Sequence, residues 1–436
     1  MKIRKGFKFG GTSTAVPNNW RTIKQLVDQE PGDVVVFLSA MGKRHKDDTK
    51  ITTLLQRISH KRSHGNYWDD VFQEFSERHL EMAQEFGLNV HSLQDELDRI
   101  KNLIETGCSN DVILSSGEKL CAQLFAEFGG YTYVDPYDHI VYVLDDGSPN
   151  LKAQSRSCDG RVIIMAGFFG RGLDGDIKVF KKGGTDTTLG YVTDQWDLEP
   201  TRWSDTAMLT ADPGIVPGAQ VVKLATWDEF IHVVDITPNV FHPDGARLCV
   251  NAARNTGANI YIKNTMDPYG SFTTVQEMRD LVKNPVIGVY LRDDYTMFKL
   301  DQEGIKDGVG YLHAFAGIFR DMEIPVQVGP GGSPSIPLLV RNCFLDDAIK
   351  LRIKQAVEGH HMLSNPKLTI KSVSAIFVVG DGMVGRAGFV HRITGALKDI
   401  PASALASPEG EGIVEVMVDS HDAHTAVRAL HKEFFE

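Results

Sequence analysis

The stretch Lys8-Phe9-Gly10-Gly11-Thr12-Ser13, near the amino terminus, places two adjacent glycines between a lysine and two hydroxyl side chains. The sequence predicts that a strand ends in the two glycines and that a helix opens near Asn18. Glycines let the backbone approach a ligand and present its N–H groups, and a helix N-terminus favours anions. Lys8 stands where its ammonium could stabilise a transferred phosphate. The spacing is not that of a Walker A loop, and a plain strand-to-helix bend explains this turn equally well.

A second turn of the same kind is Phe180-Lys181-Lys182-Gly183-Gly184-Thr185-Asp186-Thr187-Thr188. Its glycines and Thr185 can form an anion-binding nest of backbone N–H groups, while Asp186 could bind Mg²⁺ or orient Lys8. The alternative is a basic surface hairpin. Two similar Gly-Gly-Thr turns in one domain favour a phosphate site.

Three further segments carry polar side chains beside predicted strands or helices. Ser39-Ala40-Met41-Gly42-Lys43 follows a strand and could line the same crevice. In Ser116-Gly117-Glu118 a helix is expected to begin after Gly117. The Glu118 carboxylate would then either stabilise the helix through its dipole or bind a substrate ammonium. The stretch from Trp203 to Pro213 holds Ser204, Asp205 and Asp212, which suit ribose or Mg²⁺ contacts but also suit turn capping.

The order of elements predicts the fold class. Short apolar runs, such as residues 34–38, 161–165 and 259–262, alternate with helical segments at 68–86, 90–105 and 119–128. Strands that alternate with helices predict an α/β fold around a mainly parallel sheet, with the ligand crevice outside the carboxyl ends of the strands. After about residue 284 the pattern shortens to strand, helix, strand, and it recurs after Ser372. This predicts two small α+β modules, and 436 residues allow about two to four domains.

Composition excludes several functions. A net charge of −11 argues against a nucleic-acid partner. Five scattered cysteines suggest reduced thiols, and neither a signal peptide nor a membrane span is evident, so a soluble cytoplasmic protein is expected. Gly380 to Gly385 matches G-x-G-x-x-G, but too few residues follow for a dinucleotide-binding domain. His60 and His64 lack the Glu of a zinc hydrolase motif, and no metal-ligand cluster is predicted.

In chain order these segments resemble aspartate kinases of the amino acid kinase family. The turn at Lys8 is similar to K-F-G-G-T-S, the Ser39 segment to S-A-M-G-K, and Gly183-Gly184-Thr185-Asp186 to G-G-S-D. Gly167-Phe168-Phe169-Gly170 and Thr210-Ala211-Asp212-Pro213 also match, and residues 43–55 look like a longer loop of some bacterial members. Residues 378–383 and 426–431 resemble the second ACT domain.

The resemblance implies an α/β/α sandwich at residues 1–280 and ACT-like modules at 285–370 and 371–436. It also implies phosphorylation of the β-carboxylate of L-aspartate by ATP with Mg²⁺, at the entry to lysine, threonine and methionine synthesis, in at least a homodimer. The implied catalytic residues are Lys8 and Asp186. The implied ATP site is Lys8, Gly10, Gly11, Ser13, Ser204, Asp205 and Asp212. The implied substrate site is Thr12, Ser39, Glu118, Lys182, Gly183, Gly184 and Thr185.

Departures from the family pattern keep other interpretations open. Lys182 stands where the family has an Arg that contacts a substrate carboxylate, and lysine cannot form the bidentate fork of arginine. Gly214 replaces an Arg near the ATP phosphates, and Asn239 replaces a frequent Lys. The loop around Gly329 to Ile336 lacks the acidic residue that regulated members often carry. A kinase of another small amino or carboxylic acid, or a non-catalytic amino-acid-sensing relative, therefore remain alternatives.

Overall fold

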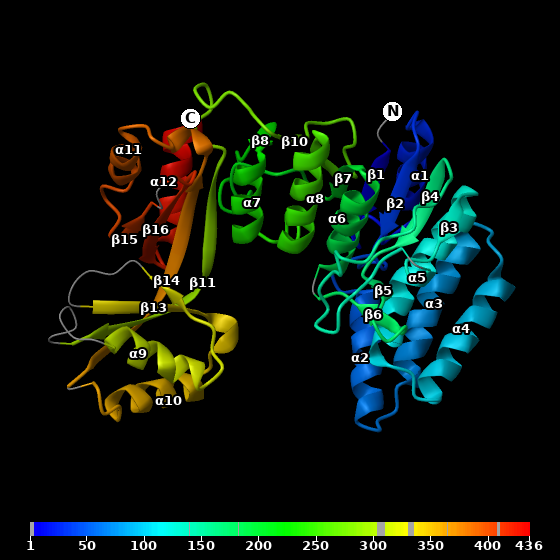
Figure 1. Cartoon of the computed structure of the whole chain (residues 1–436), viewed down its shortest axis with the longest axis horizontal. Helices are drawn as coiled ribbons and strands as arrows, with labels where there is room; N and C mark the ends of the chain where they lie inside the picture. Colours follow the sequence, from blue (N-terminus) through cyan, green and yellow to red (C-terminus); the bar gives the residue numbers. More distant parts are fainter. Residues whose placement is uncertain are drawn as a thin grey trace. The chain divides into compact units, whose positions relative to one another are not determined.

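A computed structural model describes residues 4–138, 140–181, 183–302, 310–329, 335–363, 365–407 and 410–436. The chain divides into two compact units (Figure 1). Unit 1 consists of Met1–Met208 and Val221–Arg279, and unit 2 consists of Leu209–Gln220 and Asp280–Glu436. Within the described ranges, no helix has the length and apolar character needed to span a bilayer.

Unit 1 is built on an eight-stranded sheet in the order β3-β4-β2-β1-β7-β9-β10-β8. The strands from β3 to β9 pair in parallel, β10 is antiparallel to β9, and β8 is parallel to β10. The prediction of an α/β fold with a mainly parallel sheet is therefore confirmed. The strands are β1 (Lys5–Phe9), β2 (Val34–Leu38), β3 (Thr132–Val134), β4 (Val162–Ala166), β7 (Glu199–Ser204), β8 (Leu224–Thr226), β9 (Ile260–Asn264) and β10 (Thr273–Gln276), with a separate hairpin of β5 (Phe169–Arg171) and β6 (Ile177–Val179).

The central strands of this sheet are buried throughout, since helices cover both of its faces. Phe7 and Phe9 of β1 join the core formed with the first five helices. Gly6 faces the opposite side, where an added Cβ would lie 3.1 Å from Leu189 of α6. The helices are α1 (Pro17–Gln29), α2 (Ile51–Ser63), α3 (Asp69–Glu85), α4 (Val90–Glu105), α5 (Asn110–Gly129), α6 (Gly184–Trp196), α7 (Trp227–Ile236) and α8 (Pro243–Thr256).

One predicted helix start is wrong. The sequence places a helix start after Gly117, whereas α5 begins at Asn110 and is capped by Ser109, whose side chain accepts the Val112 N–H. Gly117 lies inside the helix. A glycine suits this position because any Cβ there would come within 2.7 Å of Ile51 and 3.0 Å of Leu55. It permits close packing of α5 on α2 and does not mark a helix end. Glu118 is therefore in the helix interior, and stabilisation of the α5 N-terminus cannot explain it.

Unit 2 contains a six-stranded sheet in the order β12-β13-β11-β14-β16-β15, in which every pair is antiparallel. Its strands are β11 (Gly288–Asp301), β12 (Gln327–Val328), β13 (Ser335–Arg341), β14 (Lys367–Val379), β15 (Ala402–Ala406) and β16 (Ile413–Asp419). Its helices are α9 (Tyr311–Arg320), α10 (Asp347–Glu358), α11 (Phe389–Ala396) and α12 (Ala423–Phe435), with short 3-10 turns at Asn342–Phe344 and Asp381–Met383.

Two long strands are shared by two hydrophobic cores of unit 2. Phe298 of β11 packs with α9 and α10, whereas Val289 at the start of the same strand packs with α11 and α12. The strands expected at residues 286–291 and 296–300 are thus one strand, bent by an irregularity between Arg292 and Tyr295. The module boundary predicted between residues 370 and 371 falls inside β14.

The G-x-G-x-x-G match at Gly380 lies at the end of β14 in this antiparallel sheet, which is not the parallel setting of a dinucleotide site. A Cβ on Gly380 would meet the Pro285 carbonyl oxygen at 2.2 Å, and one on Gly382 would meet Pro285 Cα at 2.3 Å. These glycines therefore allow the close packing of two chain segments.

Candidate active site

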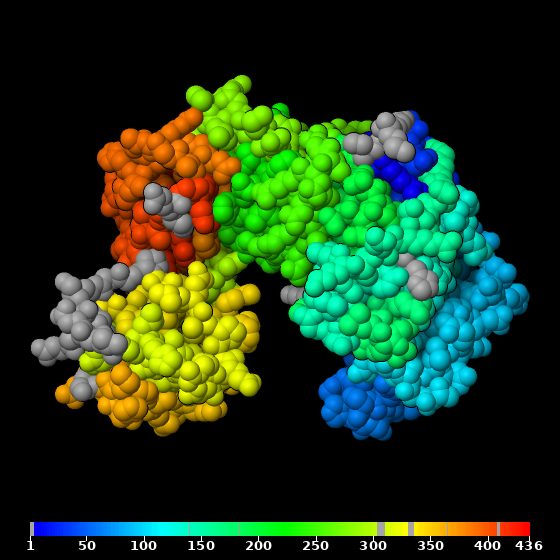
Figure 2. Space-filling model, in the orientation of Figure 1, coloured from blue at the N-terminus to red at the C-terminus, as the bar shows by residue number. Residues whose placement is uncertain are grey.

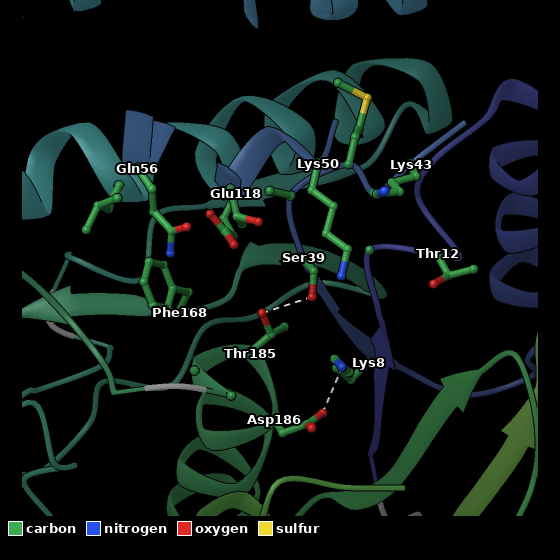
Figure 3. Close-up of a pocket in the computed structure, with 18 residues that line it drawn as sticks. Lys8, Thr12, Ser39, Lys43, Lys50, Gln56, Glu118, Phe168, Thr185 and Asp186 are labelled. Carbon is green, nitrogen blue, oxygen red and sulfur yellow. Dashed lines mark hydrogen bonds and ion pairs between the residues drawn. The ribbon is translucent and has the colours of Figure 1, made fainter. Parts of the chain in front are cut away.

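A cavity of about 600 Å³ opens in unit 1 beside the carboxyl ends of β1 and β2 and the N-terminus of α6 (Figure 3). Figure 2 shows the same unit in space-filling form, with its residues coloured from blue through cyan to green. Nine of the predicted site residues line the cavity: Lys8, Gly11, Thr12, Ser39, Glu118, Gly183, Gly184, Thr185 and Asp186. Residues from four distant segments therefore meet at one site.

A buried ion pair lies at the base of the cavity. Lys8 Nζ lies 2.8 Å from Asp186 Oδ1, and Arg202 Nε lies 3.4 Å from the same oxygen. Lys8 and Arg202 are register partners on β1 and β7, so their side chains share the sheet face that α6 covers. The His242 N–H donates to Asp186 Oδ2 at 3.0 Å. Burial alone would raise the pKa of Asp186, but the charges of Lys8 and Arg202 lower it to about 2. This contact is the one expected if Asp186 orients Lys8.

The glycine turn before α6 aims the helix N-terminus at the cavity. Gly183 has a φ of 80°, and a Cβ there would lie 2.1 Å from the His242 ring. A Cβ on Gly184 would lie 2.5 Å from the ring of Phe168. Glycine is thus required at both positions, and the first backbone N–H groups of α6 are presented where an anion would bind.

The turn Gly10-Gly11-Thr12-Ser13 after β1 is held by the loop that follows β2. The Gly42 N–H donates to the Gly11 carbonyl at 2.8 Å, and a Cβ on Gly42 would come within 2.4 Å of that oxygen. Ser39 Oγ donates to Thr185 Oγ1 at 3.0 Å, which ties the same loop to α6. The three segments that carry the predicted motifs are therefore joined by direct contacts.

Glu118 is the acidic residue at the opposite wall of the cavity from Lys8 (Figure 3). Glu118 is only 3% exposed, and its Oε2 has no hydrogen-bond partner in the described part of the chain. Burial raises the pKa of Glu118 to about 8, against the opposing backbone N–H of Ala40. A buried carboxyl oxygen without a partner is costly, so this group is suited to receive a cation from a ligand.

The other predicted residues do not line this cavity. The Ser13 hydroxyl is buried and hydrogen-bonds to Thr265 Oγ1 at 2.8 Å. Ser204 and Asp205 lie at the carboxyl end of β7, and β7 pairs with β1, so they share the sheet edge with Gly10. Asp212 belongs to unit 2, where its Oδ1 accepts the Gly214 N–H at 2.7 Å. Lys182 lies outside the described residues.

Several residues of the site, among them Arg202 and Lys50, were not predicted from the sequence. A signal for Arg202 exists, since it is a charged residue inside the otherwise buried strand Glu199–Ser204. Lys50 has no such signal, because it ends a polar loop rich in charged residues. Asn239, one of the noted departures, accepts a hydrogen bond from Arg202 through its carbonyl at 3.1 Å.

Comparisons with known proteins give matches along nearly the whole chain. The model of the Amino acid kinase family matches residues 7–264, and the ACT domain model matches residues 376–434. Aspartokinase 3 of Bacillus subtilis is 25% identical over 99% of this chain and 98% of its own length. The chloroplastic Aspartokinase 2 of Arabidopsis thaliana is 24% identical over 98% of this chain and 84% of its own length.

Solved structures share the fold. The aspartate kinase of Clostridium acetobutylicum superimposes with a TM-score of 0.89 at 23% identity, over 99% of this chain and 100% of that chain. Escherichia coli aspartokinase III in complex with aspartate and ADP gives a TM-score of 0.77 at 19% identity over the full length of both chains. At these identities the likeness concerns the architecture.

Proposed function

Because the chain belongs to the amino acid kinase family, we propose that it transfers the γ-phosphoryl group of MgATP to the β-carboxylate of L-aspartate. The product is 4-phospho-L-aspartate. The aspartokinases matched above align with nearly the whole chain, which supports this choice of substrate. The observation that carries the proposal is one cavity with Glu118, whose Oε2 has no hydrogen-bond partner among the described residues, at one wall and Lys8 with the α6 N-terminus at another.

The chemistry requires positioning more than a reactive side chain. A carboxylate oxygen of aspartate attacks the γ-phosphorus directly, and the bond from that phosphorus to the bridging oxygen of ADP breaks, so no protein nucleophile takes part. The Lys8 ammonium would stabilise the charge on the transferred group, and Asp186 would hold Lys8 in place. Glu118 would bind the substrate ammonium, and Thr12, Ser39, Thr185 and the two glycines at 183 and 184 would complete the substrate site.

The nucleotide would bind along the carboxyl edge of the sheet. Gly10 and Gly11 would contact phosphates through backbone N–H groups. Ser204 and Asp205 would contact the nucleotide from the neighbouring strand end. Ser13 would act by fixing the turn, since its hydroxyl is engaged by Thr265. Asp212 stays a proposed nucleotide contact.

Magnesium fits this site as a companion of the nucleotide. No three His, Cys, Asp or Glu residues gather into a metal site in the part of the chain that the structure describes. Mg²⁺ commonly keeps several waters and is held by substrate phosphates with one or two carboxylates, and Asp186 is the carboxylate next to Lys8. When bound, the ion would neutralise phosphate charge.

Several wider assignments belong to the same proposal. They are a place at the entry to lysine, threonine and methionine synthesis, a cytoplasmic location, and assembly of at least a homodimer through the ACT-like modules. The proposed domain limits are 1–280, 285–370 and 371–436. Residues 209–220, which carry Asp212, belong to unit 2, although the chain continues into unit 1 at both of their ends.

A coupled assay of ADP release with MgATP, with and without L-aspartate, tests the function. Aspartate-dependent turnover is expected. Turnover only with a different small acid would favour the same-fold alternative, and absence of ATP binding by calorimetry would favour a non-catalytic protein. Lys8→Ala should abolish turnover with an unchanged circular dichroism spectrum. Near wild-type activity in that variant would refute the role of Lys8.

A further inference from the structure

The loop between β2 and α2 is fixed by a buried arginine. Arg78 of α3 donates to the Gly42 carbonyl at 2.7 Å and to the Thr49 carbonyl at 2.6 Å. Its guanidinium also lies 3.4 Å from Asp48 Oδ2, and the side chains of both residues are at most 5% exposed. Arg78 therefore binds the carbonyl that directly precedes each of two cavity lysines, Lys43 and Lys50.

Asp48 fixes the same loop from within. Its Oδ2 accepts the Arg44 backbone N–H at 2.8 Å and Arg44 Nε at 3.1 Å. Burial would raise the pKa of Asp48, but the hydrogen bonds from Arg44 and the charge of Arg78 lower it far below its ordinary value. A loop whose backbone is held by a buried ion-pair network has a defined conformation at both lysines.

Lys50 is the cavity-lining lysine whose side chain pairs with no described residue. It lines the cavity and points into it toward Ser39 (Figure 3). Lys50 precedes α2, yet it makes no side-chain cap hydrogen bond to that helix. Of the lysines that line the cavity, Lys8 is paired with Asp186 and Lys43 Nζ donates to the Lys46 carbonyl at 3.1 Å. For Lys50, no ion pair or hydrogen bond of the side chain is formed with any described residue.

We propose that Lys50 binds the α-carboxylate of the amino acid substrate and so selects for α-amino acids; this rests on the proposed function. In aspartate the ammonium and the α-carboxylate are attached to the same carbon. A ligand whose ammonium binds Glu118 therefore brings its α-carboxylate into the same part of the cavity. An ionised carboxylate that leaves water needs a cation or several donors. Lys50 supplies the cation, and the Arg78 clamp holds it in position.

The experiment compares two substrates and two variants. The substrates are L-aspartate and 3-aminopropanoate, which keeps the ammonium and the reacting carboxylate but lacks the α-carboxylate. The variants are Lys50→Met and the control Lys46→Met, which removes the same charge from an exposed position of the same loop that does not line the cavity. Binding of each substrate is measured by calorimetry. The kcat/KM for each substrate is measured by steady-state kinetics at saturating MgATP.

Lys50→Met should weaken aspartate binding and lower kcat/KM for aspartate about 10- to 100-fold, the range for loss of a charge-assisted hydrogen bond. It should change neither value for 3-aminopropanoate, nor the KM for ATP, by more than about twofold. Lys46→Met should match the wild type with both substrates.

Three other results would overturn the assignment. Equal losses for both substrates, or a rise in the KM for ATP, would place Lys50 on a phosphate. Unchanged aspartate binding in Lys50→Met, with an active wild type, would remove Lys50 from the site and leave the proposed function intact. A wild type that neither binds nor phosphorylates aspartate would overturn both proposals together.

Discussion

Glu118→Gln tests the electrostatics of the proposed ammonium site. The substitution keeps the shape of the side chain but removes its ability to ionise. In the protein without substrate, burial raises the pKa of Glu118 to about 8 from the ordinary 4.5. The carboxyl is then mostly protonated at neutral pH, yet only the carboxylate can pair with an ammonium. Binding of aspartate must therefore displace a proton from Glu118.

The size of the effect follows from that pKa. The protonated fraction is roughly 0.9 at pH 7 and roughly 0.25 at pH 8.5. Deprotonation costs about 1.4 kcal/mol of binding free energy at pH 7, which is about tenfold in affinity. Aspartate should bind the wild type roughly eightfold more tightly at pH 8.5 than at pH 7. The amide of the variant has no proton to lose, so its affinity for aspartate should stay flat over this range while lying below that of the wild type at pH 8.5.

Calorimetry in two buffers with different ionisation enthalpies measures both quantities. At pH 7 the wild type should release roughly 0.9 proton per aspartate bound, and the variant should release none. Unfolding provides a second readout without ligand. Because the folded pKa lies above the unfolded one, the stabilisation is complete below about pH 4.5 and is lost as pH rises to about 8, at about 1.4 kcal/mol per pH unit. Glu118→Gln should lack this loss.

Proton release near zero for the wild type at pH 7, or equal pH dependence in wild type and variant, would refute the reasoning. Either result would mean that Glu118 is already ionised without substrate or that the ammonium binds elsewhere.

Two further substitutions test the packing and protonation that shape unit 1. Gly183→Ala should lower the free energy of unfolding of unit 1 by roughly 2 to 4 kcal/mol, because it adds a clash with His242 to the strain of a positive φ. Gly87→Ala is the matched control, with a φ of 63° and open space around its Cβ, and should cost only about 1 kcal/mol in urea unfolding; equal losses would remove His242 from the explanation. His79→Leu should reduce acid sensitivity, since burial lowers the pKa of His79 to about 4 and stability is lost as pH falls from about 6.5 toward that value, at about 1.4 kcal/mol per pH unit. Unfolding curves of wild type and variant that run parallel between pH 7 and pH 4.5 would contradict this.

The sequence predicted those parts of the fold that local patterns determine. The apolar run at 34–38 is β2 and the amphipathic segment 90–105 is α4, each with the predicted bounds. The turn at Lys8 and the loop at Ser39 could be brought to one crevice because β1 and β2 are parallel and end at the same edge of the sheet, whereas the turn at Gly183 follows the separate antiparallel hairpin of β5 and β6. The fold of unit 2 was harder to predict, since the fusion of two predicted strands into β11 depends on pairing with β14, which lies far along the chain.

The side-chain network around Arg78 shows why such contacts cannot be predicted from local sequence patterns. Nothing near Arg78 in sequence indicates that it binds the carbonyls of Gly42 and Thr49, which come 36 and 29 positions earlier. The same applies to Lys50, which is one of several charged residues in its loop. Both Lys46 and Lys50 are exposed, and only the packing of α3 against that loop distinguishes Lys50, which lines the cavity, from Lys46, which does not.

The error at Gly117 connects packing with chemistry. A glycine followed by a glutamate looks like a helix start, because glycine is a poor residue for a helix interior. In the structure the missing Cβ lets α2 approach α5, with Ile51 and Leu55 at the distances of close contact. That approach excludes water from the next residue, so Glu118 becomes buried and its pKa rises. A larger residue at 117 would push α2 outward and expose Glu118 to water. The glycine that suggests a helix start in the sequence thus helps to bury the carboxyl on which the proposed ammonium site depends.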